Sequence, residues 1–388
     1  MKILILSNNP SGYATKRLIV EINKRKDTYE VIDPADLYAY ISSTTSGHDR
    51  IYMKTEEKSE RILSKNYDAV IPRIGGKGFD HSVMILKQLS ENMNIFSTAN
   101  ERGMKICSNK FLSAQVLSRN KIRNPKQVLA YQPNDYKELL ELADFKSGTN
   151  PVIAKLQRGS LGVGVMILND ELAASTSLRS FQTLGASVIL QKYIDSGSPA
   201  NDIRVFVVGP ETKEPKIFAY KRYALDTDFR SNYSISGFGE KVSITKEEKQ
   251  MAIDAALAVG IFVCGVDIMR DSKNDDKPYV LEINSTAGLK GVEKVTGENV
   301  AGAIIDYVKG NYKQGGRSGA TAGSYEFDLD FSNKIFTPAE SIHLANKYFN
   351  EIEKLEKNNS GNTATKLFTA KHKLSNPEKG ITIKLGKK

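Results

Sequence analysis

Two short, strongly apolar segments of this chain carry polar side chains in their interiors. Residues 263–269 read Val-Cys-Gly-Val-Asp-Ile-Met around Asp267, and residues 278–284 read Pro-Tyr-Val-Leu-Glu-Ile-Asn, ending with Glu282 and Asn284. A carboxylate inside a buried strand is costly unless a cation or a hydrogen-bond donor meets it. Side chains two residues apart share one face of a strand, so two adjacent strands would bring all three together. Three hard oxygen ligands on one face predict a magnesium site.

A lysine and a glycine-rich turn supply the other half of a nucleotide site. Lys155 interrupts an apolar, strand-like run, and Gly159, Gly162 and Gly164 follow it. An ammonium group can bind phosphate oxygens, and glycines allow backbone N–H groups to approach them closely. The turn is not a Walker loop, because no lysine and hydroxyl follow its last glycine. The alternatives are a packed lysine stem with a solvated ammonium and a plain hairpin turn. With the acidic strands, the pattern predicts an ATP-dependent enzyme.

Composition places the chain among soluble globular proteins. Its 388 residues allow two or three domains, and 40% hydrophobic with 26% charged residues is ordinary for such proteins. No apolar run is long enough to span a bilayer and no signal-peptide pattern is present, so we expect a cytoplasmic protein without a membrane partner. The net charge of +10 favours acidic partners, and residues 366–388 concentrate it, with seven lysines against one acid.

Covalent nucleophilic catalysis is not indicated. Cys107 and Cys264 form no disulfide framework or metal-ligand cluster, and we expect Cys264 to lie in the core. The four histidines are scattered, and no serine or cysteine triad is recognisable. This fits a ligase, in which ATP supplies the activation.

Residues 1–105 alternate between strand and helix patterns. The predicted strands and helices are 2–6 (strand), 16–24 (helix), 30–32 (strand), 68–72 (strand) and 82–92 (helix). Such alternation predicts a parallel, doubly wound sheet. Ligands of these sheets gather beyond the carboxyl ends of the strands, where Arg73 follows the third predicted strand.

The remaining chain divides by pattern into four further ranges. A smaller α+β unit, 106–195, begins with a helix over 109–120 that we expect Ser108 to cap. The other elements predicted there and in the next unit, 196–312, are strands 152–156, 165–168 and 187–193 and helices 171–181, 246–259 and 299–312. Residues 313–324 have the glycine- and serine-rich composition of a flexible linker. Residues 325–388 form a basic extension with one helical pattern and a lysine-rich end that we expect to be disordered.

Over residues 1 to about 312, the chain resembles the RimK-type glutamate ligases of the ATP-grasp superfamily. The segments that carry the resemblance are Val70–Gly75, Lys155–Gly159 with Gly162 and Gly164, Asp202–Arg204, Asp228–Asn232, Gly265–Ile268, Glu282–Asn284 and Gly288–Glu293. The resemblance implies an α/β and α+β architecture, an ATP-grasp fold with an N-terminal doubly wound pre-ATP-grasp domain. The basic extension lies outside it.

The resemblance also implies roles for individual residues. Those implied to bind ATP are Lys110, Lys155, Gly159, Gly162, Gly164, Gln191, Lys192, Tyr193, Asp202, Arg230, Ser231 and Asn232. Those implied to hold two Mg²⁺ or Mn²⁺ ions are Asp267, Glu282 and Asn284, and those implied in catalysis are Arg222, Arg230 and Asn232. Arg73 is implied to hold a substrate carboxylate.

Several of these positions have plainer alternatives. Lys110 can be an exposed helix residue, Asp202 a strand cap and Arg73 one half of a surface salt bridge. Two positions depart from the family pattern, since Lys192 stands where many relatives carry glutamate and Tyr223 where close relatives carry a second arginine.

The implied reaction is ATP-dependent ligation of L-glutamate to a protein or peptide C-terminus through an acyl phosphate. The implied acceptor is a small-subunit ribosomal protein or a growing glutamate chain, and family members are often homo-oligomers such as tetramers. Two alternatives stay open. One is an amino-acid ligase that acts on a carrier protein or a cofactor, and the other is a non-catalytic, ATP-binding, ribosome-associated protein.

Overall fold

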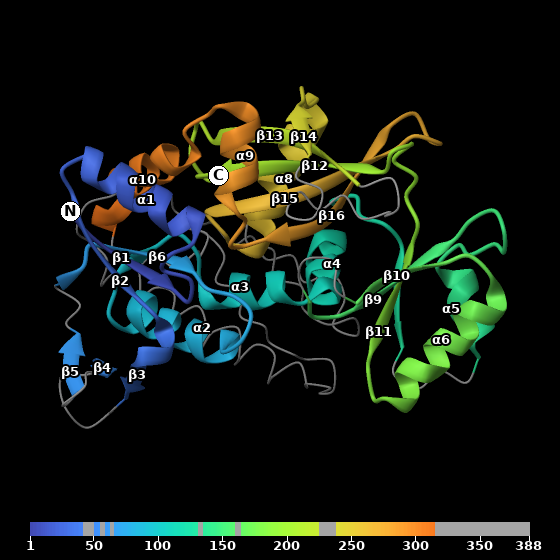
Figure 1. Cartoon of the computed structure of the whole chain (residues 1–388), viewed down its shortest axis with the longest axis horizontal. Coiled ribbons are helices and arrows are strands. Elements are labelled where there is room, and N and C mark those ends of the chain that lie inside the picture. The colour runs from blue at the N-terminus through green and yellow to red at the C-terminus, as the bar shows by residue number, and fades with distance from the viewer. Residues whose placement is uncertain are drawn as a thin grey trace, which may run out of the picture. The chain divides into compact units, whose positions relative to one another are not determined.

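The computed structural model describes residues 1–41, 50–54, 59–62, 66–130, 135–159, 164–224 and 238–314 (Figure 1). The first part contains a four-stranded sheet, here called the N-terminal sheet, in the order β2-β1-β6-β7 with all neighbours parallel. Its strands are β1 (Lys2–Ser7), β2 (Thr28–Ile32), β6 (Ala69–Arg73) and β7 (Phe96–Ser97). The connecting helices are α1 (Tyr13–Lys24) and α2 (Phe79–Lys87), which continues as a π-helix over Gln88–Asn92. The predicted parallel sheet is confirmed.

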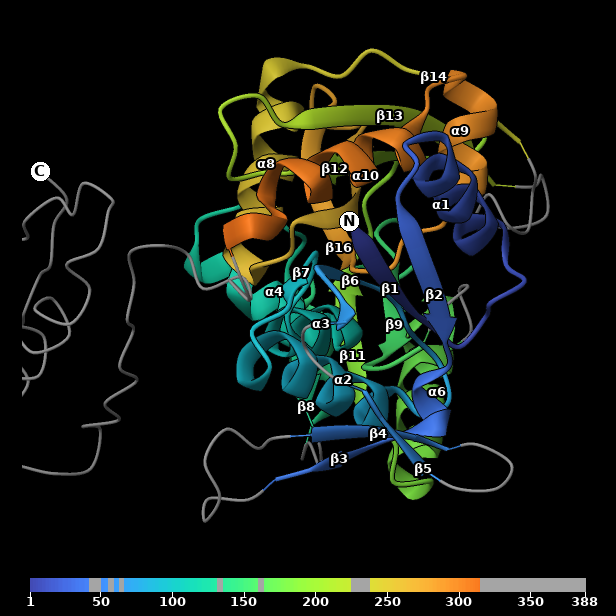
Figure 2. The same cartoon turned by 90° about the vertical axis from the view of Figure 1, so that its left-hand side faces the viewer.

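Helices cover both faces of the N-terminal sheet because its central strand is apolar on both sides. Leu4 and Leu6 of β1 belong to a core that includes Leu86 of α2. Ile3 and Ile5 belong to a second core, formed with α1 and the last long helix of the described chain. Adjacent strand residues point to opposite faces, so this alternation gives the doubly wound arrangement (Figure 2).

A second, three-stranded antiparallel sheet in this part was not predicted. Its strands are β3 (Leu37–Tyr40), β4 (Arg50–Lys54) and β5 (Ser59–Ile62), preceded by a 3₁₀ turn over Pro34–Asp36. In β3 only Leu37 is buried, while Tyr38 and Tyr40 are exposed. Strands with so little buried surface leave a weak apolar signal in the sequence.

Two consecutive helices lead out of the N-terminal part. They are α3 (Glu101–Ser108) and α4 (Lys110–Arg119). The prediction that Ser108 caps the second helix is wrong, because Ser108 is the last residue of α3. Asn109 is the cap instead, and its side-chain oxygen accepts the backbone N–H groups of Phe111 and Leu112, both at 3.1 Å.

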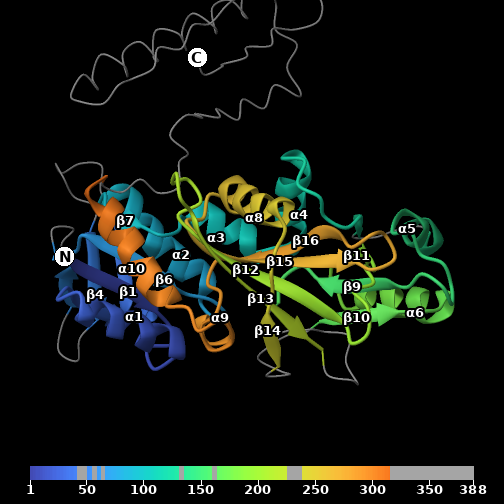
Figure 3. The ribbon, with the colours of Figure 1, turned by 90° about the horizontal axis from the view of Figure 1, so that it is seen from above.

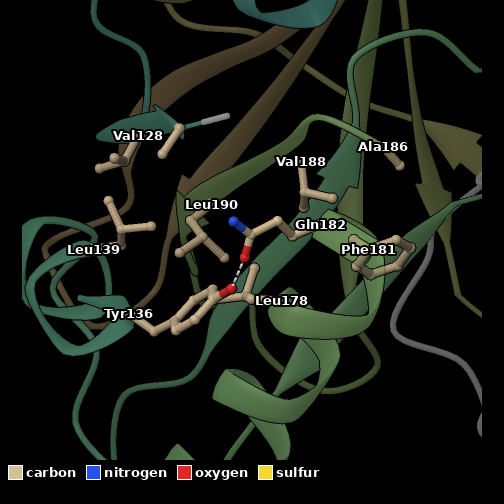
Figure 4. Close-up of a pocket in the computed structure, with 10 residues that line it drawn as sticks. Val128, Tyr136, Leu139, Leu178, Phe181, Gln182, Ala186, Val188 and Leu190 are labelled. Carbon is tan, nitrogen blue, oxygen red and sulfur yellow. Dashed lines mark hydrogen bonds between the residues drawn. The ribbon is translucent and has the colours of Figure 1, made fainter. Parts of the chain in front are cut away.

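The central sheet has four antiparallel strands in the order β10-β9-β11-β8. Its strands are β8 (Gln127–Ala130), β9 (Val152–Leu156), β10 (Val165–Leu168) and β11 (Val188–Lys192), and its helices are α5 (Tyr136–Leu142) and α6 (Glu171–Thr183). The helices and the sheet enclose a core of their own. A small apolar pocket lies between them, where Tyr136 donates a hydrogen bond to Gln182 (Figure 4). None of the predicted site residues lines this pocket.

The C-terminal sheet has five antiparallel strands in the order β14-β13-β12-β15-β16 (Figure 3). They are β12 (Asn201–Val208), β13 (Lys216–Tyr223), β14 (Gly239–Lys241), β15 (Val263–Asp271) and β16 (Lys277–Asn284). The helices are α8 (Lys246–Val259), α9 (Leu289–Thr296) and α10 (Val300–Asn311), followed by a 3₁₀ turn over Tyr312–Gln314. A capping box of Thr245 and Glu248 starts α8, and Gly260, with φ of 73°, ends it.

Alternation along β12 determines which face of the C-terminal sheet is polar. Val205 and Val207 belong to the core that contains α8, whereas Phe206 and Val208 belong to the core that contains α9 and α10. Asp202 and Arg204 share the face of Phe206, at the end of the strand where apolar packing stops.

Cys264 is fully buried in β15, as predicted. No helix of the described chain is long and apolar enough to cross a membrane. The basic extension and the predicted linker from residue 315 onward lie outside the described residues.

Candidate active site

Six side chains form a continuous polar face across four strands of the C-terminal sheet. They are Arg222 of β13, Asp202 and Arg204 of β12, Asp267 of β15, and Glu282 and Asn284 of β16. The strand register brings them together, because Asp202 pairs with Arg222, Arg204 with Asp267, and Asp267 with Glu282. Sequence reasoning predicted that Asp267, Glu282 and Asn284 would meet on one face, and they do.

A β-bulge next to Asp267 and Glu282 influences the direction in which these two side chains point. Asp267 pairs with Glu282, but the next residue, Ile268, pairs with Val280, so Leu281 is the extra residue. Bulges bend a strand and redirect its side chains. Gly265, the partner of Asn284, has no room for a side chain, since an added Cβ would lie 2.7 Å from Cβ of Ala287.

The acidic pair and Asn284 fit a divalent cation. Nδ2 of Asn284 lies 3.2 Å from Oδ2 of Asp267 and 3.3 Å from Oε1 of Glu282, so a donor occupies the space between the two carboxylates. A half-turn of the amide would exchange this nitrogen for its oxygen. Two carboxylates and an amide oxygen are hard ligands suited to Mg²⁺ or Mn²⁺, which complete their shells with water and phosphate. Among the described residues no group of three or more His, Cys, Asp or Glu side chains could hold a metal ion, and this set has two carboxylates and one amide.

Two arginines hold Asp267 ionised. Nε and Nη2 of Arg204 donate to its two oxygens at 2.7 and 2.6 Å, and Nη2 of Arg222 lies 2.9 Å from Oδ2. Burial raises the pKa of Asp267, but the charges and hydrogen bonds of the arginines outweigh it and lower the pKa to about 2. A buried carboxylate held in its charged form is ready to bind a cation.

Arg204 is the residue of this face that sequence reasoning did not select as a site residue. A signal existed, because Asp202 and Arg204 stand two residues apart at the start of an otherwise apolar strand. Arg222 donates hydrogen bonds to both carboxylate oxygens of Asp202, and its Nε lies 2.7 Å from Oδ1. Burial raises the pKa of Asp202, Asp267 adds to the rise, and Arg222 opposes it.

Lys155 of the central sheet has a positively charged ammonium group that interacts electrostatically with Asp267 and Glu282. It lies on β9, and its Nζ donates to Oε1 of Gln191 on β11 at 2.8 Å. The pKa of Lys155 is lowered to about 8, chiefly by burial and also by the charge of Lys110, while Glu282 and Asp267 oppose the change. These mutual effects show that the phosphate-binding candidate and the metal-binding candidates share one electrostatic environment.

Lys110 lies beside the start of the glycine-rich turn. Its Nζ donates to the carbonyl of Gly159 at 2.7 Å, and its backbone N–H donates to the carbonyl of Gln157 at 3.0 Å. Gly164 closes the described part of the turn with φ of 73°, a conformation that favours glycine. Gly162 lies outside the described residues, as do Arg230, Ser231 and Asn232.

Lys192 takes part in an ion-pair cluster at the edge of the central sheet. Its Nζ lies 3.0 Å from Oδ2 of Asp144, and Nζ of Lys126 lies 2.8 Å from the other oxygen. The backbone N–H of Lys192 donates to the carbonyl of Lys126 at 2.9 Å. The side chain that departs from the family pattern therefore has an ion-pair partner, Asp144, which lies just after α5. Tyr193, the next residue, is half-buried, and burial raises its pKa.

Arg73 connects the N-terminal sheet to the loop after β16. It ends β6, and its Nη2 donates to the carbonyls of Thr286 and Ala287 at 3.1 and 2.9 Å. Among the described residues no carboxylate pairs with it, so the alternative of a surface salt bridge does not describe its contacts. Burial lowers the pKa of Arg73 to about 10, and the side chain stays cationic at neutral pH.

Comparisons with known proteins agree with this geometry. Residues 107–308 match the RimK-like ATP-grasp domain, and residues 1–104 match the RimK PreATP-grasp domain. A "Probable alpha-L-glutamate ligase" of Vibrio cholerae is 37% identical over 311 residues, which cover 80% of this chain and 96% of the relative.

Solved structures share the fold at low sequence identity. An ATP-grasp ligase of Chryseobacterium gregarium, solved with ADP and a leader and core peptide, has a TM-score of 0.60 at 14% identity and covers 80% of this chain and 97% of its own. The ATP-grasp ligase PsnB, solved with minimal precursor, Mg and ADP, has a TM-score of 0.59 at 15% identity and covers 80% of this chain and 98% of its own. The chain belongs to the RimK family of ATP-grasp ligases, enzymes that form amide bonds.

Proposed function

We propose that this enzyme uses ATP to ligate L-glutamate to the C-terminal carboxylate of a protein or peptide. One observation supports the proposal most directly. Asp267, Glu282 and Asn284 lie together on one face of the sheet, and the two carboxylates are near enough to Lys155 for their charges to affect its pKa. Cations that bind phosphate and ligands that bind a divalent metal are the two requirements of phosphoryl transfer from ATP.

The proposed chemistry has two steps. A carboxylate oxygen of the acceptor attacks the γ-phosphorus of ATP, the bond from that phosphorus to the bridging oxygen breaks, and ADP leaves. The amine nitrogen of glutamate then attacks the carbonyl carbon of the acyl phosphate. The bond from that carbon to the phosphate oxygen breaks, inorganic phosphate leaves, and the nitrogen loses a proton to solvent. The net result is one peptide bond, one ADP and one phosphate.

The residues of this chain act chiefly by position and charge. Lys110 and Lys155 would hold the phosphates of ATP, and the backbone of Gln191 to Tyr193 would hold the adenine. Arg222 would face the γ-phosphate with Arg230 and Asn232, and Asp267, Glu282 and Asn284 would hold two Mg²⁺ ions. The bound metal would neutralise charge that develops on the phosphates. Preorganised charges of this kind require little rearrangement during the reaction.

Arg73 would bind a substrate carboxylate. It is a half-buried cation at the carboxyl end of β6, and it contacts the loop that follows the metal-binding candidate Asn284. The planar guanidinium has further donors besides the one that binds Thr286 and Ala287, and its fork matches a carboxylate.

Relatives support the choice of substrates. The curated relatives are named as probable α-L-glutamate ligases, which supports glutamate as the amine. The peptide in the Chryseobacterium gregarium complex supports a peptide acceptor, and the Mg and ADP of the PsnB complex support magnesium. A small-subunit ribosomal protein as the acceptor rests on the family resemblance.

The test is incubation of the enzyme with ATP, Mg²⁺, a short peptide and each amino acid in turn. ADP release and the mass of the peptide are measured together. We expect glutamate alone to give both ADP and a mass increase of one or more glutamyl residues. ADP release without a change of peptide mass would reject the peptide acceptor, and no ADP release with any amino acid would favour a non-catalytic ATP-binding protein.

A further inference from the structure

Arg222 is shared between two carboxylates of the polar face. Its Nε donates to Oδ1 of Asp202 at 2.7 Å, and its Nη2 contacts Oδ2 of Asp202 and also Oδ2 of Asp267, the latter at 2.9 Å. The arginine is almost fully buried, and Asp202 is only 6% exposed. Within the described chain, Asp202 has no partner other than this arginine.

The oxygen of Asp267 that Arg222 contacts is crowded with donors. Among the described residues, Oδ2 receives Nη2 of Arg204, Nη2 of Arg222 and Nδ2 of Asn284, whereas Oδ1 receives Nε of Arg204 alone. A carboxylate oxygen has about two lone pairs for donors or a metal. A divalent cation that binds Oδ2 of Asp267 therefore competes with the donors on that oxygen, and Arg222 is one of them.

Arg222 and Arg204 would keep different contacts if a cation displaced them from Asp267. Arg204 makes both of its hydrogen bonds to Asp267, so it has no second carboxylate among the described residues. Arg222 keeps a paired, two-nitrogen contact with Asp202 even when it leaves Asp267. An arginine released without a second partner would remain a competitor for Asp267, because an unpaired buried charge is costly.

We infer that Asp202 is a positioning residue that retains Arg222 when a divalent cation binds Asp267. Through this contact Asp202 prevents Arg222 from competing with the cation and holds its guanidinium beside the reacting phosphate. The inference rests on the proposed metal site at Asp267, Glu282 and Asn284. It assigns Asp202 a role different from the nucleotide contact that the family resemblance implies.

Substitution of Asp202 by asparagine tests the role with binding measurements. Asp202→Asn keeps the shape but removes the charge, so Arg222 turns to Asp267. Mn²⁺ binding, followed by the electron paramagnetic resonance signal of free Mn²⁺, should weaken about tenfold, the size of one charge-assisted hydrogen bond. Binding of ADP without metal should stay within about twofold of the wild type, because the charge that is removed pairs with Arg222 and not with the nucleotide.

The double variant Asp202→Asn/Arg222→Gln separates positioning from a general structural effect. It removes both members of the ion pair, so Arg222 no longer competes for Asp267, and Arg204 is the arginine that remains there. Mn²⁺ binding should return to the wild-type level or become tighter, whereas ADP formation from ATP should stay strongly reduced because Arg222 is missing. Replacing both partners of a buried pair is usually tolerated, so this variant remains informative even if Asp202→Asn does not fold.

Glu248→Gln is a matched control, because Nε and Nη2 of Arg270 bind that buried carboxylate at 2.6 and 2.8 Å in the same paired manner. It should bind Mn²⁺ like the wild type. Wild-type Mn²⁺ binding by Asp202→Asn, or weak Mn²⁺ binding by the double variant, would overturn the inference. A clear loss of metal-free ADP binding in Asp202→Asn would instead support the hypothesis that Asp202 contacts the nucleotide. The Mn²⁺-binding and ADP-binding measurements use neither glutamate nor a peptide, so they do not depend on the identity of either substrate.

Discussion

Asp267 and Glu282 face each other across the β15–β16 ladder, and the bulge in that ladder comes directly after this pair. The two carboxylates differ in their surroundings. Two arginines bind Asp267, whereas the amide of Asn284 is the donor that contacts Glu282 at 3.3 Å. Glu282 is therefore the ligand with more free capacity for a cation, and its loss is the most direct test of the metal site.

Glu282→Gln should abolish ADP formation. The change removes one anionic ligand with little change of volume, and we expect the melting temperature to stay close to that of the wild type. ADP release at saturating Mg²⁺ is the measurement. Glu247→Gln, which alters a half-exposed carboxylate paired with Arg123 at 2.8 Å, is the control and should keep full activity. Near-normal turnover of Glu282→Gln would remove this residue from the metal site.

The pH dependence of ATP use should report Lys155. Its pKa is lowered to about 8 by burial, and it must be protonated to bind phosphate. The charged fraction is complete well below pH 8 and is lost as pH rises through that value, so kcat/KM for ATP should fall on the alkaline side. Lys155→Arg keeps its charge at all these pH values and should remove the decline near pH 8. An unchanged profile in that variant would assign the decline to another group.

Glutamate should stimulate ATP turnover at least about tenfold more than glutamine, because the neutral amide cannot replace a charged hydrogen bond to arginine in a partly desolvated site. The candidate partners are Arg73, Arg222 and Arg230. Arg73→Met should raise the KM of a carboxylate substrate and leave the KM of ATP nearly unchanged. Equal stimulation by glutamine, or a preference for lysine, would reject glutamate as the amine.

Deletion of residues 325–388 should leave activity on a short peptide within a few-fold of the full chain, because the family match ends before them. The same deletion should weaken association with ribosomes or long polyglutamate, since residues 366–388 carry seven lysines and one acid. That difference should shrink as salt rises and screens the lysines. Loss of short-peptide activity on deletion would show that the extension supports the catalytic part directly.

Strongly patterned elements were predicted from the sequence almost to the residue. Strands β9 and β10 and helix α8 have the predicted limits, because apolar runs and glycine or proline residues mark their ends. The second sheet of the N-terminal part was missed, since its first strand, β3, buries Leu37 and exposes its other three residues. Ser108 was predicted to cap a helix that begins at Asn109, but both are good capping residues, and the backbone shows that Ser108 ends α3 and Asn109 caps α4.

The metal-binding candidates were predictable because a carboxylate in an apolar strand is conspicuous. The contact of Arg204 with Asp267 and the partners of Asp202 and Lys192 were not, because each depends on which residue the fold brings alongside. Asp202 meets Arg222 through the pairing of β12 with β13, a register that local sequence patterns do not specify. Asp144 reaches Lys192 from the end of α5, which is 48 positions earlier in the chain.

The alternation of side chains along β1 has a consequence for how the molecule is divided. Through Leu4 and Leu6, and through Ile3 and Ile5, the N-terminal sheet shares both of its cores with the C-terminal sheet, whereas the central sheet keeps a core to itself. The cores thus join the first and last thirds of the described chain, and the middle third, inserted between them in sequence, has a core of its own. Local unfolding of the middle third would therefore expose neither of the two shared cores.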